Sequence, residues 1–371
     1  MIKILFFIET LKAGGAEKVM IDLVNHMDQT KFDITVQTVW PYDSGKYLVP
    51  GIHYKSMYAQ KSKTNVFRYR AEAESGLAYR LHVKDDYDIE CAYLEMGPTK
   101  VMAASTNRKA KKLAWIHCDL TKHVADPQAY AAKTAPWYAK FDQIVCVSEN
   151  VRESYEKLFG FFPPARVLYN VVDDTTIREK AKKSIPDKLQ KRRLTLVSLG
   201  RLTYQKGYDM LLKVHESLIR EGYGYDLWIA GEGEDRPMLE QYIKEHGLSE
   251  SVKLLGFQEN PYPILEASDI LVCSSRYEGL STFVTEGLIL GKPIVTTDCT
   301  GMRELLGNSE FGLITEMKEE SLRDGIKRML KDTALREDYA QKAAERGEAF
   351  FALRLTKTTE EFFESLVGES H

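Results

Sequence analysis

The sequence predicts an α/β protein built from two doubly wound, Rossmann-like domains. Apolar runs of strand length alternate with helical segments through both halves of the chain, which is the pattern of parallel sheets covered by helices. The 371 residues suffice for two hydrophobic cores, and 44% hydrophobic with 28% charged residues is typical of soluble globular proteins. A net charge of −3 gives no indication of nucleic-acid binding.

The first predicted strand, residues 2–8, is followed by Gly14 and Gly15 and then by an amphipathic helix. Strand, glycine loop and helix together form the nucleotide-binding unit of doubly wound folds. The fingerprint GxGxxG does not occur there, and GxxxxGK[ST] occurs nowhere in the sequence, which argues against a dinucleotide enzyme and a P-loop protein. A tight turn that needs glycine for packing is the structural alternative.

Four further strands are predicted in this half, at residues 33–39, 89–94, 112–117 and 143–148. His117 ends the third of them, and the carboxyl ends of parallel strands line the ligand crevice of such sheets. A histidine at a strand end is more commonly a hydrogen-bonded structural residue. Residues 61–84 predict a basic helical segment with interleaved aromatic residues, for which a solvated helix face is the favoured interpretation.

The five cysteines are odd in number, widely spaced and without a CxxC pair. This pattern argues against a disulfide framework and a zinc site, and it fits a reducing cytosol. The apolar run at the N-terminus is too short for a signal peptide, and no apolar run in the sequence has the length of a membrane span. The expected location is the cytoplasm, at most with peripheral contact at the inner face of the membrane.

Residues 171–193 are polar, highly charged and contain Pro186, which predicts a linker between domains at 1–170 and 194–351. The strand at 194–199 opens into GRLTYQKGYDML, and a helix follows. Arg201 and Lys206 therefore lie beside a helix N-terminus, an arrangement that suits an anionic ligand. Ordinary surface cations are the alternative.

The stretch around residues 271–304 predicts a strand, a loop, a helix, a second strand at 293–297 and the start of another helix. Glu278 lies in the loop and Glu286 inside the helix, with Ser281 as its N-cap and Gly291 just past its end. Two glutamates at this spacing are common on solvated helices. In this context, however, a carboxylate stands next to backbone N–H groups that suit an anion.

The spacing of Glu278 and Glu286, together with EGL-S, GKPIV and GMREL, resembles the retaining, nucleotide-sugar-dependent glycosyltransferases of family 4. The resemblance covers nearly the whole chain and implies the GT-B fold, in which two Rossmann-like domains face a cleft. It also implies that the terminal helix, residues 352–371, crosses back to the N-terminal domain.

In this family Arg201 and Lys206 would hold the diphosphate, Glu278 the hydroxyls of the donor sugar and Glu286 those of the ribose. His117 would contact the sugar and orient the acceptor. The other positions that the resemblance places against the nucleotide sugar are Gly14, Gly15, Gly231, Phe257, Gly279, Leu280, Ser281 and Thr282. Because members of this family contact the base through backbone groups, the resemblance does not tell whether the donor carries uracil or guanine.

The predicted activity is a retaining, metal-independent hexosyltransferase that needs no cofactor besides its donor, a UDP-sugar or GDP-sugar. The acceptor would be a glycan or lipid-linked saccharide in bacterial surface polysaccharide synthesis. Family members often use an N-domain helix such as 61–84 for membrane contact. The alternatives are a nucleotide-sugar epimerase or a phosphorylase on the same scaffold, and a catalytically silent nucleotide-sugar-binding protein. An assay without acceptor separates a transferase from an epimerase. The presence of Glu278, Glu286, Arg201 and Lys206 together argues against a catalytically silent protein.

Overall fold

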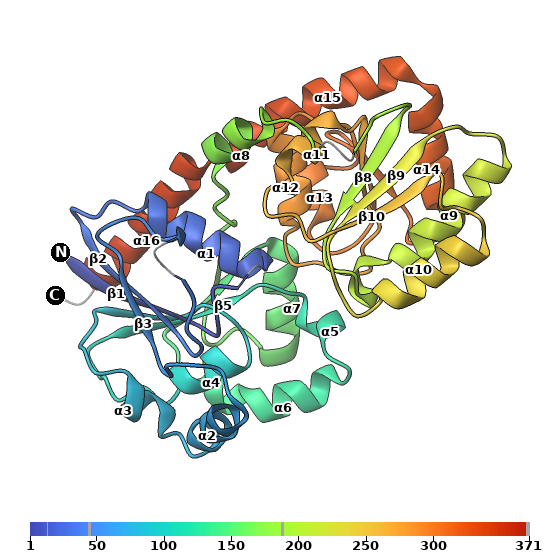
Figure 1. The fold of residues 1–371 in the computed structure, drawn as a ribbon. Helices are drawn as coiled ribbons and strands as arrows, with labels where there is room; N and C mark the ends of the chain where they lie inside the picture. Colours follow the sequence, from blue (N-terminus) through green and yellow to red (C-terminus); the bar gives the residue numbers. More distant parts are fainter. Residues whose placement is uncertain (13, 44–45, 187–188, 369–371) are drawn as a thin grey trace. The chain divides into compact units, whose positions relative to one another are not determined.

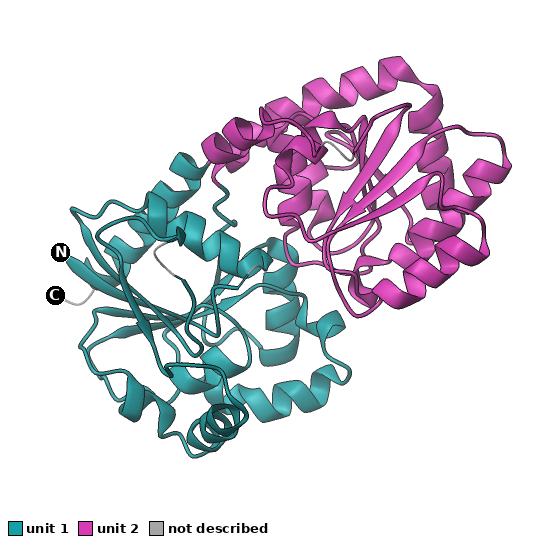
Figure 2. Cartoon of the chain, in the orientation of Figure 1, with its two compact units in different colours: residues 1–172, 352–371 teal, residues 173–351 magenta. Residues whose placement is uncertain are grey.

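The chain forms two compact units, each with its own parallel sheet (Figures 1 and 2). The computed structural model describes residues 1–12, 14–43, 46–186 and 189–368. Unit 1 comprises residues 1–172 together with 352–371, and unit 2 comprises residues 173–351. The predicted class of two Rossmann-like α/β domains is confirmed.

Unit 1 holds a seven-stranded sheet in the order β3-β2-β1-β4-β5-β6-β7, with every neighbouring pair parallel. Helices α1 and α16 cover one face, and α3 and α4 lie on the other (Figure 1). The elements of unit 1 are β1 (Ile2–Ile8), α1 (Gly15–His26), β2 (Phe32–Thr38), β3 (His53–Ser56), α2 (Lys63–Glu74), α3 (Ala78–His82), β4 (Ile89–Ala92), α4 (Gly97–Met102), β5 (Lys111–Ile116), α5 (Leu120–His123), α6 (Pro127–Tyr138), β6 (Gln143–Cys146), α7 (Glu149–Phe159), β7 (Ala165–Val167) and α16 (Ala352–Gly368).

The predicted return of the terminal helix to the N-terminal domain is confirmed by its packing. The ring of Phe363 lies with its centroid 6.1 Å from that of Phe6 and 6.4 Å from those of Phe32 and Trp115. The backbone N–H of Asp28 also donates to the Glu360 carboxylate over 2.6 Å. The apolar side of α16 thus completes an aromatic core that strands β1, β2 and β5 begin.

Unit 2 holds a six-stranded parallel sheet in the order β10-β9-β8-β11-β12-β13. Its core consists of buried apolar side chains of the strands and of the helices that cover the sheet. The elements of unit 2 are α8 (Asp174–Ala181), β8 (Thr195–Leu199), the 3₁₀ turn η2 (Tyr204–Lys206), α9 (Tyr208–Arg220), β9 (Asp226–Ala230), α10 (Arg236–Glu245), β10 (Val252–Gly256), α11 (Tyr262–Ala267), β11 (Ile270–Cys273), α12 (Thr282–Ile289), β12 (Ile294–Thr297), α13 (Met302–Leu306), β13 (Leu313–Thr315), α14 (Glu319–Lys331), α15 (Thr333–Gly347) and the 3₁₀ turn η3 (Glu348–Phe350).

Several details differ from the sequence-based expectation, and the edge strands β3 and β13, for example, were not predicted. The strand at 143–148 was predicted to be the last of the N-terminal domain, but β7 pairs with β6 and extends the sheet by one strand. Residues 171–193, predicted as a linker from their polarity, contain α8. Its Ile177 and Ala181 are buried within unit 2, so two apolar contacts suffice to fix a helix that is otherwise polar.

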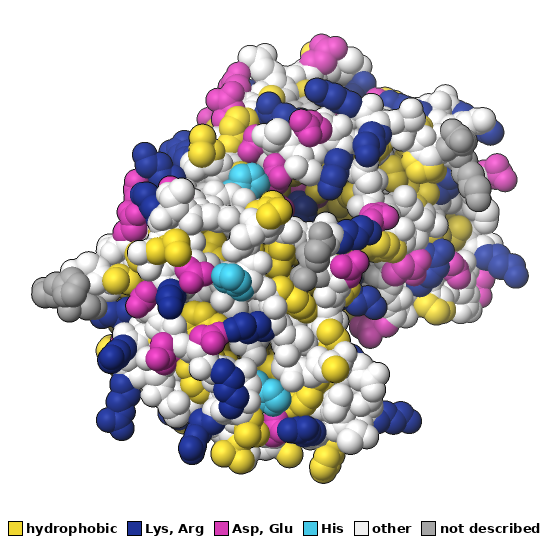
Figure 3. Space-filling model, turned by 60° about the vertical axis from the view of Figure 1, so that its left-hand side comes forward, with side chains coloured by type: hydrophobic (Ala, Val, Ile, Leu, Met, Phe, Trp, Pro, Cys, Tyr) yellow, Lys and Arg dark blue, Asp and Glu magenta, His cyan; other side chains and the backbone are white. Residues whose placement is uncertain are grey.

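The described residues on the face drawn in Figure 3 show no extended field of one sign. Positive and negative side chains are interspersed over the face seen in Figure 3, as the small net charge of −3 leads one to expect. Among the helices that the structure describes, none is both long enough and apolar enough to cross a bilayer.

Candidate active site

The candidate site in unit 2 lies where the strand order reverses. Strands β8 and β11 are neighbours, and the loops that follow them leave the same edge of the sheet. In doubly wound sheets, ligands bind outside the carboxyl ends of the strands at this point. Arg201 and Lys206 lie in the loop after β8, and Glu278 lies in the loop after β11. The topology therefore brings two separately predicted motifs together.

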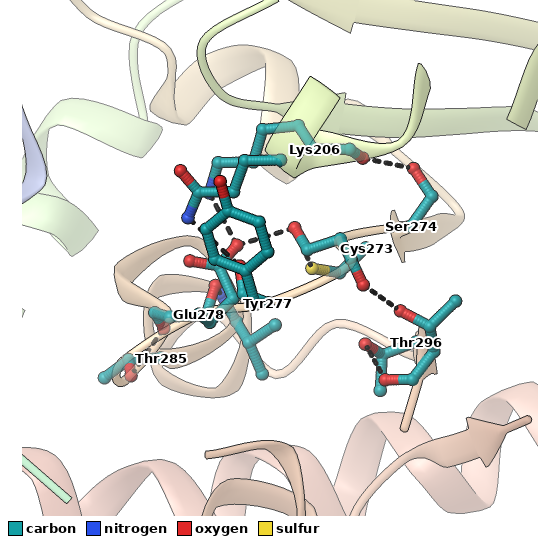
Figure 4. A network of polar contacts seen from close by, with 12 residues as sticks. Lys206, Cys273, Ser274, Tyr277, Glu278, Thr285 and Thr296 are labelled. Carbon is teal, nitrogen blue, oxygen red and sulfur yellow. Dashed lines mark hydrogen bonds and ion pairs between the residues drawn. The ribbon is translucent and has the colours of Figure 1, made fainter. Parts of the chain in front are cut away.

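A buried ion pair joins these two loops. Nζ of Lys206 donates to Oε1 of Glu278 over 2.6 Å, and the two side chains are only 17% and 8% exposed (Figure 4). Burial alone would lower the pKa of the Lys206 ammonium, but the negative charge of Glu278 outweighs it and holds this pKa above its usual value. Lys206 is therefore a cation at neutral pH in a site that is largely shielded from solvent.

A second donor binds the same carboxylate oxygen. Oγ of Ser275 donates to Oε1 of Glu278 over 2.6 Å, and the Ser275 carbonyl accepts from Oγ1 of Thr297, also over 2.6 Å. Thr297 is the last residue of β12, so the sheet itself sets the position of the carboxylate. Within the described parts of the chain, the side-chain hydrogen bonds to Glu278 all go to Oε1.

Helix α12 begins directly after this carboxylate. Oγ of Ser281 accepts from the N–H of Val284 over 3.4 Å, which confirms the predicted N-cap, and Gly291 follows the helix with φ +62°. Gly279, Leu280 and Ser281 are buried, and Thr282 is half-buried. A helix N-terminus in this setting favours an anion, because its first N–H groups point out of the helix along the axis.

Glu286, the second predicted glutamate, is also buried. It lies in α12, is 4% exposed, and its Oε1 accepts from the hydroxyl of Tyr262 in α11 over 3.3 Å. A carboxylate at this depth keeps its charge only with polar partners, so it is not a solvated surface charge.

The loop that contains Arg201 packs backbone to backbone against the loop after β9. The N–H of Gly200 donates to the Ala230 carbonyl over 3.0 Å. Gly231 has φ +144°, and a Cβ at this position would lie 1.9 Å from the Gly200 carbonyl oxygen, so a side chain cannot be accommodated. The Arg201 side chain is exposed and makes no hydrogen bond or ion pair with other described residues.

The loop after β10 completes this edge of the sheet. The N–H of Gly231 donates to the Gly256 carbonyl over 2.8 Å, and the next residue, Phe257, is 62% exposed. The structure thus brings Arg201, Lys206, Gly231, Phe257 and the Glu278 loop to one edge of unit 2. Gly14, Gly15 and His117 belong to the other unit.

In unit 1, the corresponding edge carries a histidine and a buried carboxylate. His117 follows β5, and its backbone N–H and that of Cys118 both donate to Oε1 of Glu95, the second over 3.1 Å. The imidazole packs on the Tyr93 ring, and its Nε2 is buried without a hydrogen-bond partner among the described residues. Burial lowers the pKa of His117, with Glu95 opposing, so the ring is neutral at pH 7.

Gly14 and Gly15 stand at the start of α1, directly after the loop that leaves β1. Gly14 is the N-cap of this helix, with an extended backbone at φ −154°. Like His117, these residues lie beyond the carboxyl ends of strands β1 and β5 in the unit 1 sheet. Their positions agree with the predicted strand, glycine loop and helix.

Sequence reasoning missed three residues of this arrangement. Glu95 lies just beyond the end of β4, at the same edge as His117, and the next residue, Met96, has φ +64°, a backbone conformation that non-glycine residues rarely adopt. The position of Glu95 directly after a predicted strand could have identified it as a candidate site residue. Ser275 and Thr297 act through contacts across the sheet, which no local pattern reveals.

Metal ligation was predicted to be unnecessary. No group of three or more His, Cys, Asp or Glu side chains suited to a metal ion occurs in the residues that the structure describes. That the reaction needs no metal remains a prediction.

Comparisons with known proteins identify the class. The fold matches that of sucrose-phosphate synthase from Thermosynechococcus elongatus with a TM-score of 0.82, at 16% identity and with 100% of both chains covered. It also matches Anabaena HepE in complex with UDP-glucose, with a TM-score of 0.75, 18% identity and coverage of 98% and 100%. The two parallel-sheet units therefore form the GT-B architecture of glycosyltransferases.

Two family models match successive parts of the chain. "Glycosyltransferase Family 4" matches residues 13–176, and "Glycosyl transferases group 1" matches residues 179–346. The chain is 28% identical over 367 residues to N-acetylgalactosamine-N,N'-diacetylbacillosaminyl-diphospho-undecaprenol 4-alpha-N-acetylgalactosaminyltransferase of Campylobacter jejuni, covering 96% of this chain and 97% of that protein. It is 22% identical to the amylovoran biosynthesis glycosyltransferase AmsD of Erwinia amylovora, covering 92% and 94%. The protein belongs to glycosyltransferase family 4.

Proposed function

We propose that this glycosyltransferase is a retaining, metal-independent hexosyltransferase that uses a UDP-sugar or GDP-sugar. The acceptor is a glycan or lipid-linked saccharide in bacterial surface polysaccharide synthesis. The observation that carries the proposal is the buried pair of Lys206 and Glu278 at the strand-order reversal of unit 2. The names of the relatives from Campylobacter jejuni and Erwinia amylovora support the class of acceptor, and HepE bound to UDP-glucose supports the class of donor.

In the proposed reaction, the bond between the anomeric carbon and the diphosphate oxygen breaks, and the acceptor oxygen forms the new glycosidic bond. The departing nucleoside diphosphate gains negative charge, which Lys206, Arg201 and the N-terminus of α12 stabilise. Lys206 is already fixed by Glu278, so little reorganisation is needed as the charge develops. Arg201 has no protein partner to give up among the described residues.

The carboxylates bind hydroxyl groups in this proposal. Glu278 holds the donor sugar through the oxygen that Lys206 and Ser275 leave available, and Glu286 holds the ribose. His117, neutral at pH 7 and with a buried Nε2, contacts the sugar and orients the acceptor. The acceptor hydroxyl attacks on the face that the diphosphate leaves, and its proton passes to a phosphate oxygen, so the anomeric configuration is retained. No covalent nucleophile is needed.

A panel of UDP-hexoses and GDP-hexoses tests this proposal, first without acceptor and then with an undecaprenyl-diphosphate saccharide. We expect slow donor hydrolysis alone, faster release of UDP or GDP with acceptor, and a product whose anomeric configuration, measured by NMR, equals that of the donor. EDTA should leave turnover unchanged. Release of an epimerised sugar without acceptor would instead identify an epimerase, an inverted product would exclude retention, and loss of turnover in EDTA would exclude metal independence.

We further propose that helix α2 contacts the inner face of the membrane. Phe67 is 76% exposed on this helix, and three cations, Lys61, Lys63 and Arg70, line the same shallow depression. Cations attract anionic lipid headgroups, and an exposed aromatic ring can insert between them. We expect the protein to sediment with vesicles that contain phosphatidylglycerol, and Phe67→Ser to bind them several-fold more weakly. Equal sedimentation of both proteins, or none, would contradict this contact.

A further inference from the structure

We propose that Arg276 is a positioning residue that fastens the Lys206 loop to the Glu278 loop through Asp209 and Tyr204. The contact holds the buried ion pair together in the absence of substrate. For its catalytic consequence the inference rests on the proposed function, whereas the fastening itself is a property of unit 2 alone. Arg276 precedes Glu278 by two positions, and Asp209, in the first turn of α9, follows Lys206 by three, so the contact joins the two segments that carry the ion pair.

The guanidinium of Arg276 binds Asp209 and Tyr204 through its two terminal nitrogens. Nη1 and Nη2 donate to the two carboxylate oxygens of Asp209 over 2.9 and 2.7 Å, and Nη1 also donates to the Tyr204 carbonyl over 2.7 Å. The guanidinium carbon lies 4.0 Å from the centroid of the Tyr204 ring. A two-pronged pair with a stacked ring fixes both position and orientation, which a lysine in place of Arg276 could not reproduce.

The backbones of the two loops are fastened at the same place. The N–H of Arg276 donates to the Gln205 carbonyl over 2.7 Å, and Nε2 of Gln205 donates to the Tyr277 carbonyl over 3.0 Å. Gly207 has φ +65°, and a Cβ there would lie 2.2 Å from the Ser274 carbonyl oxygen. The loops therefore approach each other more closely than any side chain at residue 207 would allow.

The charge balance favours the closed contact. Burial would raise the pKa of the Asp209 carboxyl, but the hydrogen bonds and positive charge of Arg276 outweigh it and leave this pKa below its usual value. Both groups are thus ionised at neutral pH. Because this pair is only partly exposed, with side chains at 20% and 34%, it is screened less than a surface pair. Its loss would let the two loops separate.

The consequence for function concerns geometry rather than chemistry. Arg276 does not contact Lys206 or Glu278 in any described interaction, yet both are attached to the loops that it joins. A displacement of about 1 Å in a charge-stabilising group can cost up to ~100-fold in rate. Arg276 therefore acts by keeping Lys206 and Glu278 at hydrogen-bond distance.

The test measures Lys206 directly. Acylation of this amine in the folded, full-length protein, quantified by peptide mass spectrometry, should be slow because its ammonium is paired and buried. We expect Arg276→Gln and Asp209→Asn each to speed this labelling by about tenfold, the scale of one charge-assisted hydrogen bond. The double variant should be labelled no faster than Arg276→Gln alone, because both changes break one contact. The inference would be overturned if the single variants were labelled at the wild-type rate. It would also be overturned if the acceleration in the double variant equalled the product of the two single accelerations.

Arg193→Gln is the matched control. Arg193 pairs with Asp226 over 2.8 Å at the amino end of the same sheet, away from both loops. This variant should lose thermal stability without faster labelling of Lys206; faster labelling would show that Arg276 acts only through general stability.

In parallel, UDP and GDP binding and donor turnover are measured. A wild-type protein that binds neither nucleotide refutes the proposed function and leaves the labelling result standing. Unchanged kcat in Arg276→Gln, with nucleotide binding intact in wild type, refutes only the positioning role.

Discussion

Lys206→Ala should lower turnover by about a hundredfold or more, the scale typical of a lost charge-stabilising donor. The ammonium of Lys206 is buried beside Glu278, where a cation interacts more strongly with a developing negative charge than it would in water. Its removal takes away the stabilisation of the departing diphosphate. The measurement is kcat with a saturating sugar nucleotide, because the effect belongs mainly to the transition state rather than to donor binding.

Two further measurements make this result interpretable. The substitution leaves Glu278 buried without its cation, so the variant should also be less stable, and turnover must be expressed per folded molecule, as measured by circular dichroism. Lys213→Ala is the control on the same unit: this lysine lies in α9, is 51% exposed and pairs with Glu319 over 3.2 Å. Its turnover should equal that of wild type. A loss of less than tenfold in Lys206→Ala would contradict the proposed role of Lys206.

Glu278→Gln should produce a loss of similar size, about a hundredfold, together with a changed pH profile. Glutamine has the shape of glutamate and can still accept from Lys206 and Ser275, but it lacks the charge that holds the Lys206 pKa high. Without that charge, burial lowers the pKa of Lys206. The ammonium is then lost as the pH rises, at a lower pH than in wild type, so the residual turnover should decline on the alkaline side first.

The pH dependence of kcat, measured for Glu278→Gln and for wild type, tests this prediction. Only the loss of the Lys206 ammonium moves the alkaline limb of the profile to lower pH. A merely misfolded variant would lose turnover equally across the pH range, and a role for Glu278 restricted to sugar binding would leave the alkaline limb where it is in wild type. Glu266→Gln is the matched control, since this glutamate of α11 is 49% exposed and pairs over 3.4 Å with Lys292, beyond the C-terminal end of α12. Neither its turnover nor its pH profile should change.

Much of the fold was predictable because its signals are local. The strand at residues 2–8 was predicted with its observed bounds, and the predicted cap at Ser281 forms as expected. Strand β7 was missed because three residues at the edge of a sheet leave too little pattern. Helix α8 was missed because polar composition outweighed its two buried apolar residues. In both cases tertiary contacts decide a structure that the local sequence leaves undecided.

The site divides in the same way. Lys206 and Glu278 were found because each lies in a motif after a strand, and doubly wound topology places such loops together. Their contact, and the attachment of the carboxylate to Thr297 through Ser275, depend on side-chain directions across three strands. Likewise, Asp209 and Arg276 lie 67 positions apart, so nothing in either loop alone indicates their pairing.

The return of α16 to unit 1 has a consequence for biosynthesis. Unit 2 is a continuous segment, whereas unit 1 needs Phe363, which the ribosome adds after all of unit 2. The segment made first is therefore finished last, contrary to the usual order in which N-terminal domains fold before those behind them. Until α16 emerges, the rings of Phe6, Phe32 and Trp115 lack the ring that completes their cluster, so the aromatic core of unit 1 stays incomplete throughout the synthesis of unit 2.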